Sequence, residues 1–195
     1  MAKNQKLLLS TLVVGLLCGL TTLGVFGLFS ATTQNAGNEI STGTVAISDN
    51  DAGSALYNIT GAKPGDTVSK CIRTTYTGSL PANVHLYTTS APGALAQYID
   101  LTITKGTQLN SSFPDCTGFT ADSGGQLFAG TLQSFEQTRN AFAAGIATVP
   151  AGQTAWLTGA SVVYRIDATL QAGTPDASQG SSSGAHTFIW EARNT

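Results

Sequence analysis

Charged residues are scarce in this chain of 195 residues and make up only 10% of it. Nine are Lys or Arg and 11 are Asp or Glu, and two of the basic residues, Lys3 and Lys6, stand at the N-terminus. A protein that binds nucleic acid needs a basic surface to neutralise phosphates. The rest of this chain is mildly acidic, so we expect no nucleic-acid partner.

Histidine is scarcer still, with only His85 and His186. A catalytic zinc needs three protein ligands and an open coordination position, and the chain has no H-E-x-x-H motif. Both histidines occupy expected strand positions opposite the main apolar residues, which predicts ordinary surface side chains. We therefore expect no metal site and no cofactor.

Catalytic motifs are absent or misplaced. Residues 180–184 match the pattern G-x-S-x-G, but that motif works only at a tight strand-to-helix turn of an α/β sheet. Here it lies in a Gly- and Ser-rich connection between two expected strands. The acidic residues are scattered singly, so no carboxylate pair is apparent. We expect no catalytic residue and a protein that is not an enzyme.

Asp49 and Asp51, together with Asn50 and Gly53, resemble a fragment of a calcium loop. The further acidic ligands of such a loop are missing. The composition is also typical of a turn. A solvated turn is the favoured interpretation, and a calcium site is the alternative.

Charge is absent altogether from residues 7–29, which follow Lys3 and Lys6. A basic segment followed by an apolar one is typical of an export signal. We predict a signal helix over 1–27 with cleavage within about 27–31, in a region marked by Val25, Gly27 and Leu28. A run of 23 residues is also long enough to span a bilayer, so a retained membrane anchor is the alternative. The mature protein is then secreted, and only the leader contacts the membrane.

Cysteine occurs three times, and Cys18 lies inside the leader. Cys71 and Cys116 remain as an even pair in an exported protein, which predicts a disulfide. The alternative is two buried free thiols.

Long helical periodicity is missing from the remainder of the chain. Short runs of alternating apolar and polar residues, separated by turn residues, predict eight to ten strands. Such a pattern indicates an all-β fold, a jelly-roll-like antiparallel β-sandwich with one or two short helical turns. We expect one domain over 28–195, in which 28–38 is a mobile N-terminal segment. The clearest predicted strands are 39–48, 55–59, 68–77, 83–89, 97–105, 126–129, 160–170 and 188–192. A short helix is predicted over 131–139.

Several stretches, in the same order along nearly the whole chain, resemble the TasA and camelysin (CalY-type) family of secreted bacterial proteins. The stretches that carry the resemblance are 28–31 (LFSA), 40–45 (ISTGTV), 48–51 (SDND), 63–66 (KPGD), 76–82 (YTGSLPA), 164–166 (YRI), 179–180 (QG) and 187–192 (TFIWEA).

The resemblance implies a leader removed by a dedicated signal peptidase of the SipW type and a role as a subunit of extracellular biofilm-matrix or cell-surface fibres. In such fibres the processed N-terminus inserts as a strand into the neighbouring subunit, so the main partner is another copy of the chain. Camelysin relatives are labelled metallopeptidases, but this sequence offers no zinc motif to carry that label. The alternatives are a monomeric or anchored surface-binding module and, least favoured, a camelysin-type peptidase.

Cleavage near Gly27 would expose two large apolar residues followed by small residues that tolerate a strand. This segment is the candidate donor strand, and its residues are Leu28, Phe29, Ser30, Ala31, Thr32 and Thr33.

Overall fold

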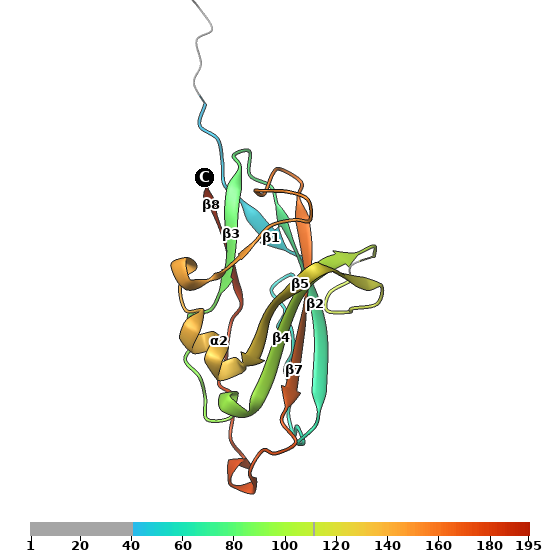
Figure 1. Ribbon diagram of the computed structural model, residues 1–195, viewed down its shortest axis with the longest axis vertical. Coiled ribbons are helices and arrows are strands. Elements are labelled where there is room, and N and C mark those ends of the chain that lie inside the picture. The colour runs from blue at the N-terminus through green and yellow to red at the C-terminus, as the bar shows by residue number, and fades with distance from the viewer. Residues whose placement is uncertain (1–40, 111) are drawn as a thin grey trace, which may run out of the picture. The chain divides into compact units, whose positions relative to one another are not determined.

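The computed structural model describes residues 41–110 and 112–195 (Figure 1). Within it, Thr42–Thr195 forms one compact unit. Several sequence predictions fall outside the described residues: the signal helix over 1–27, the cleavage region at Val25, Gly27 and Leu28, the mobile segment 28–38 and the donor strand from Leu28 to Thr33.

The described residues form eight strands, one α-helix and three short 3-10 helices. The strands are β1 (Ile47–Asp49), β2 (Thr67–Tyr76), β3 (Ala82–Tyr87), β4 (Ile99–Gln108), β5 (Phe119–Thr131), β6 (Ile146–Thr148), β7 (Ser161–Leu170) and β8 (Ile189–Asn194). The helices are α2 (Leu132–Thr138), η1 (Ala96–Tyr98), η2 (Phe142–Ala144) and η3 (Asp176–Ser178). None of the helices in this part of the chain is long and apolar enough to cross a membrane.

The strands form two antiparallel sheets that pack face to face (Figure 1). The five-stranded sheet has the order β1-β2-β7-β4-β5, and the three-stranded sheet has the order β6-β3-β8. The expected all-β sandwich is therefore confirmed. The order β2-β7-β4-β5 opposite β8-β3-β6 is that of a jelly roll. In a regular jelly roll the first strand pairs with the last, whereas here β1 pairs with β2.

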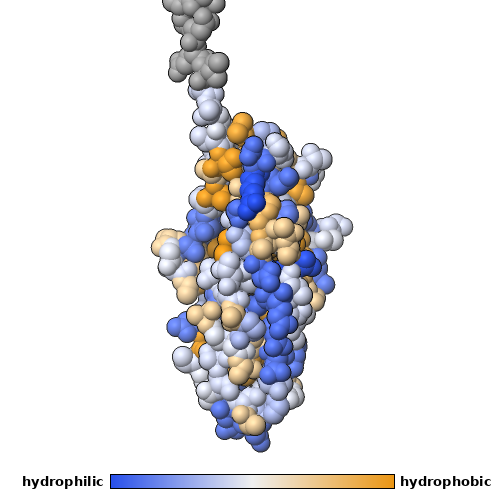
Figure 2. Space-filling model, turned by 90° about the vertical axis from the view of Figure 1, so that its left-hand side faces the viewer, coloured by the Kyte–Doolittle hydropathy of each residue, from blue (hydrophilic) through white to orange (hydrophobic). Residues whose placement is uncertain are grey.

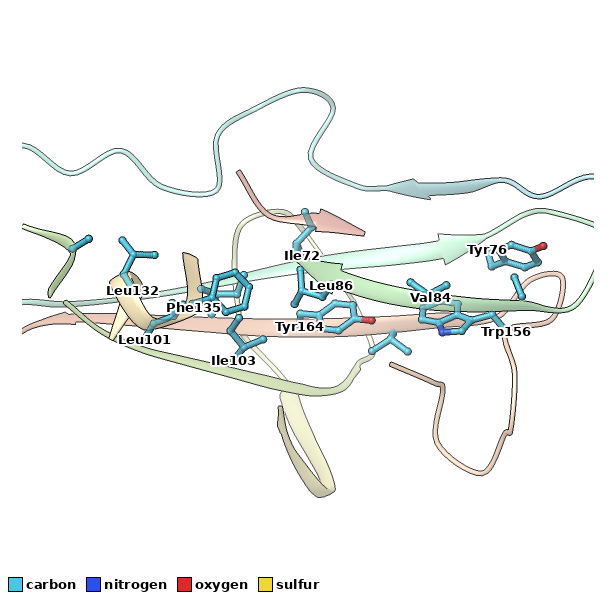
Figure 3. Close-up of a cluster of buried hydrophobic side chains, with 14 residues drawn as sticks. Ile72, Tyr76, Val84, Leu86, Leu101, Ile103, Leu132, Phe135, Trp156 and Tyr164 are labelled. Carbon is cyan, nitrogen blue, oxygen red and sulfur yellow. The ribbon is translucent and has the colours of Figure 1, made fainter. Parts of the chain in front are cut away.

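The core lies between the sheets, because each long strand turns alternate side chains inward. Figure 3 shows Tyr76, Val84 and Trp156 at one end of this core and Leu132 and Phe135 of α2 at the other. All core members drawn there are at most 3% exposed: Ile72, Tyr76, Ala82, Val84, Leu86, Ala96, Leu101, Ile103, Leu132, Phe135, Trp156, Val162, Tyr164 and Ile166. The two sheets thus share one continuous hydrophobic core.

Buried polar atoms also join the two sheets. The Trp156 indole donates to the Thr148 carbonyl at 2.7 Å, and the Tyr164 hydroxyl donates to Thr148 Oγ1 at 2.8 Å. A buried donor without a partner costs roughly 1–3 kcal/mol. These bonds therefore fix β6, which has only three residues, against β7 of the other sheet.

The outer face of the five-stranded sheet is covered by the β4–β5 connection. Cys71 points to this face and forms the predicted disulfide with Cys116, which is confirmed. The Cys71 amide donates to the Pro114 carbonyl at 3.1 Å, and the Gln108 side chain donates to the carbonyls of Asp115 and Thr117. The connection is therefore fastened to β2 at Cys71 and to β4 at Gln108.

Some strand predictions were wrong or incomplete. Residues 55–59 form no strand, because this part of the β1–β2 crossover has no neighbouring strand to pair with. The run 39–48 yields only β1 near its end, although 44–46 are hydrogen-bonded to 77–80. Residues 141–152 contain η2 and β6, although they are not among the clearest predicted strands. β5 is far longer than 126–129, since pairing with β4 extends through Gly- and Ser-rich residues with two register shifts.

Candidate functional site

The first and last strands of the described fold, β1 and β8, lie next to each other without pairing. Each is an edge strand of its sheet, and some of their Cα atoms lie within 8 Å of one another. Between them is a hollow of about 240 Å³. We call this region the seam; its lining residues are Ile47, Ser48, Asp49, Thr74, Phe188, Ile189 and Trp190.

On the side that faces the seam, the backbone of β8 has no hydrogen-bond partner among residues 41–110 and 112–195. The Thr195 amide donates to the Pro81 carbonyl on the β3 side, and β8 pairs with β3 residue by residue. Since amides alternate between the two edges of a strand, those of Trp190, Ala192 and Asn194 point to the seam. An edge with free amides and carbonyls is a template for another strand.

Two aromatic side chains, Phe188 and Trp190, belong to the lining of the seam, which also has aliphatic and polar members. Behind them, the rings of Trp190 and Tyr164 lie 5.2 Å apart between centroids, and those of Phe188 and Phe135 lie 5.7 Å apart. Alternation places the Trp190 side chain inward. The seam therefore combines an edge strand with a partly apolar lining, and both are features of a strand-binding groove.

Two polar atoms at the seam are buried without a partner among the described residues. They are Thr74 Oγ1 and Trp190 Nε1. Both adjoin the Tyr164 hydroxyl, whose pKa is raised by burial to about 12, but neither reaches hydrogen-bonding geometry with it. Buried polar groups are normally satisfied by protein or water.

In the acidic turn after β1, the carboxylates accept hydrogen bonds from backbone amides of the same turn. Asp49 Oδ1 accepts from the Asp51 amide at 3.1 Å, and Asp51 Oδ1 accepts from the Gly53 amide at 2.6 Å. Burial, together with the neighbouring Asp51, raises the pKa of Asp49. In the described part of the chain, no group of three His, Cys, Asp or Glu residues is arranged to hold a metal ion.

The other boundary of the seam is a polar cluster that the sequence did not predict. His186 is not on a strand, contrary to expectation, and is partly buried; its Nε2 is 2.6 Å from the Tyr57 hydroxyl. Glu136 of α2 is 3% exposed, and neither of its carboxylate oxygens has a hydrogen-bond partner in the described chain. The sequence does contain one indication that Glu136 is buried. Glu136 is four residues after Leu132, so the two residues share one side of the helix.

His85 points away from the core as expected, but it is covered. Its ring stacks on Phe142 with centroids 4.2 Å apart, and its Nδ1 lies 2.7 Å from the Phe142 carbonyl. Residues 180–184 lie in the β7–β8 connection, where the carbonyls of Ser182 and Ser183 accept from Leu95 and Gly93. The structure does not bring His85 and residues 180–184 together.

One end of the sandwich exposes apolar side chains. Figure 2 shows them gathered where the described chain begins. Val45, Leu80 and Leu157 are 38%, 37% and 51% exposed. Hydrogen bonds connect their segments, from Thr44 to Ser79 and from Thr158 to Gly78. We call these three residues the end patch; exposed apolar patches commonly mark interaction sites.

No protein-family model matches this chain, and no curated protein is significantly similar to it.

Proposed function

We propose that this protein is a secreted structural protein, the subunit of an extracellular biofilm-matrix or cell-surface fibre. It is exported through its leader, processed by a dedicated signal peptidase, and assembled by insertion of the new N-terminus into the next copy. The observation that carries the proposal is the seam, where the edge strand β8 lies beside a hollow that Phe188 and Trp190 help to line. The resemblance to the TasA and camelysin family supports the same function.

The occupant of the seam is the segment from Leu28 to Thr33 of a neighbouring copy. Added as a strand beside β8, it would pair with the amides of Trp190 and Ala192 and turn alternate side chains toward the core. The eight residue steps from Thr33 to Ser41 can extend over roughly 27 Å. That reach allows the segment to bridge to an adjacent subunit whose surface covers the end patch.

Insertion requires β1 to move. A strand paired on both sides needs its neighbours about 9.6 Å apart, twice the usual spacing, whereas parts of β1 and β8 are within 8 Å. β1 has only three residues paired with β2, and none of them is fully buried. Its displacement is therefore a small rearrangement, and the incoming strand replaces the contacts that are lost.

The first experiment deletes residues 28–35 from the exported protein. We expect the sandwich to fold unchanged by circular dichroism and fibres to disappear in electron microscopy. Fibres that persist after the deletion would exclude the donor-strand mechanism. An intact secreted protein that stays monomeric at every salt concentration and pH would exclude the function itself.

The second experiment blocks one sheet edge at a time with proline, which removes an amide and projects its ring at the backbone nitrogen. Ala192→Pro removes an amide that points to the seam, so we expect assembly to stop. Ala147→Pro is the matched control on β6, at the opposite edge of the same sheet. Ala82 exchanges hydrogen bonds with Trp156 at 3.0 and 2.9 Å, so the even residues of β3 bond toward β6, and the Ala147 amide faces away.

The control should assemble normally. If Ala147→Pro stops assembly and Ala192→Pro does not, the acceptor is β6 rather than the seam. The mass of the secreted protein adds an independent check: a start near Leu28 is expected, whereas a start at Met1 or Ala2 favours a retained anchor.

A further inference from the structure

We propose that Tyr57, His186 and Glu136 form a pH-sensitive clasp that closes one end of the seam and loosens when the Glu136 carboxyl ionises. The inference names a regulation of the seam, and rests on the proposed function for its effect on assembly.

The clasp joins the two crossovers that lead to the seam. Tyr57 is on the crossover that leads from β1, on one side of the seam, to β2. His186 is three residues before β8, on the other side of the seam. Their hydrogen bond of 2.6 Å links these segments, and their ring centroids lie 5.5 Å apart. Phe188, which lines the hollow, contacts His186 edge-on at 5.7 Å. Breaking the clasp therefore frees the residues that border the hollow.

Tyr57 is the donor in this bond. Burial, and next the nearby Glu136, raise the pKa of Tyr57, so its hydroxyl stays protonated. Burial lowers the pKa of His186 and favours the neutral ring. With Nε2 accepting from Tyr57, the His186 proton is assigned to Nδ1, which faces the Gly184 carbonyl at 3.4 Å.

Glu136 is the group whose charge changes near neutral pH. It follows Phe135, whose ring contacts Phe188, and its carboxylate is buried without a partner. Burial raises the pKa of Glu136 to about 7. An ionised carboxylate in such surroundings is strongly disfavoured unless water reaches it. The electrostatic influence of Glu136 on Tyr57 places the Tyr57 segment near this carboxyl, so water would reach the carboxyl when that segment lifts away.

No neighbouring element supplies Glu136 with a counter-charge. The charged or titratable residues on the elements packed against α2, and just after it, are Tyr98, Asp100, Lys105, Asp122 and Arg139. None of them makes a hydrogen bond or ion pair with Glu136. Lys105 pairs with Asp122 at 3.6 Å, Asp100 accepts from Gln171, and the Arg139 guanidinium donates to the Ala144 carbonyl.

The sign of the pH dependence follows from the raised pKa. A Glu136 carboxyl exposed by opening titrates near 4.5, and the buried one near 7. The contribution of Glu136 to the stability of the closed clasp is therefore greatest below pH 4.5. This contribution falls as pH rises from 4.5 to 7, and it changes little above pH 7. His186 acts in the opposite direction, because its pKa is lowered by burial and closure is therefore opposed as pH falls from 6.5 toward that lowered pKa. From pH 5 to pH 8 the opening equilibrium of the wild type should rise roughly ten- to a hundredfold relative to a variant that lacks the Glu136 carboxyl and keeps His186.

The test is amide hydrogen exchange of the full chain between pH 5 and 8, read over residues 54–60 and 184–190 and corrected for the intrinsic exchange rate at each pH. We expect the ratio of opening in the wild type to opening in Glu136→Gln to rise with pH, because His186 contributes equally to both proteins. Exchange in β2 and β7 is the internal control and should not follow this profile. Equal pH profiles in the wild type and Glu136→Gln would overturn the clasp.

Two further variants keep the test decisive if the amide of Glu136→Gln disturbs packing. Glu136→Met replaces the ionisable group with an apolar side chain of similar length, and its pH profile should match that of Glu136→Gln. Tyr57→Phe removes only the hydroxyl, and should raise opening at every pH while the dependence on pH persists. A Tyr57→Phe profile identical to the wild type would refute the role of the hydrogen bond.

Assembly kinetics separate this inference from the proposed function. The ratio of fibre growth rates in the wild type and in Glu136→Gln should rise with pH. If exchange follows the expected profile and this ratio stays constant, the clasp does not control the seam. If no fibres form under any condition, the proposed function fails, and the exchange result still decides the clasp.

Discussion

The two sheets of this sandwich differ in how completely they are built. In the five-stranded sheet, β2, β4 and β7 have ten residues each, and a disulfide-bonded connection covers the outer face. The three-stranded sheet has strands of six, three and six residues, and β8 has a free edge beside the seam. The first sheet supplies most of the fold's regular pairing. The three-stranded sheet has one strand fewer than the four strands of a regular jelly-roll sheet.

Under the proposed function, this difference assigns stability and assembly to different sheets. Both sheets have edge strands, and an edge strand is a template for another strand unless it is protected. The β8 edge is distinguished from the others by the adjoining hollow, which Phe188 and Trp190 help to line. The comparison predicts that changes in the five-stranded sheet affect folding, while changes along β8 affect assembly.

The largest expected effect comes from Trp156, which belongs to the interface of both sheets. It is fully buried, and its indole donates to Thr148 of β6. Trp156→Ala should cost about 3–5 kcal/mol of unfolding free energy, a large part of the total for a domain. Urea unfolding followed by circular dichroism measures it. If the three-stranded sheet unfolded alone, in a separate transition, the two sheets would not share one cooperative core.

The next effect is confined to the five-stranded sheet. Cys71 and Cys116 are 45 residues apart, so a Cys71→Ser, Cys116→Ser double variant should lose about 4 kcal/mol on the chain-entropy estimate. Thermal unfolding of the variant, and of the reduced wild type as its control, should agree. Fibre formation below the new melting temperature should be retained. A folded variant that no longer assembles would contradict the separation of the two sheets.

The long strands could be predicted from the sequence, since each buries one face over many residues. Alternation located β2, β4 and β7 to within about three residues, and the spacing of Leu132 and Phe135 located α2. The same rule failed where no partner strand exists. Residues 55–59 alternate, yet they form no strand, and Tyr57 instead bonds to His186.

The seam could not be predicted for a different reason. It exists because β1 pairs with β2 rather than with β8, and that choice of partner is a property of the whole sandwich. Glu136 shows the same limit on a smaller scale. Its position on the helix predicts burial, but only the three-dimensional arrangement leaves it without a cation.

The smallest expected effect compares one matched contact on each sheet. Arg193 lies over the Phe142 ring at 3.9 Å on the three-stranded sheet, and Arg165 lies over Phe119 at 5.2 Å on the five-stranded sheet. Exposed cation–π contacts contribute about 0.5–1 kcal/mol, and the shorter one should contribute more. Arg193→Lys and Arg165→Lys keep the charge but lose the planar stacking. Urea unfolding should show the larger loss for Arg193→Lys, with neither variant losing fibres. Because Arg193 is on β8, a loss of assembly in that variant alone would extend the acceptor surface from the edge of β8 to its outer face.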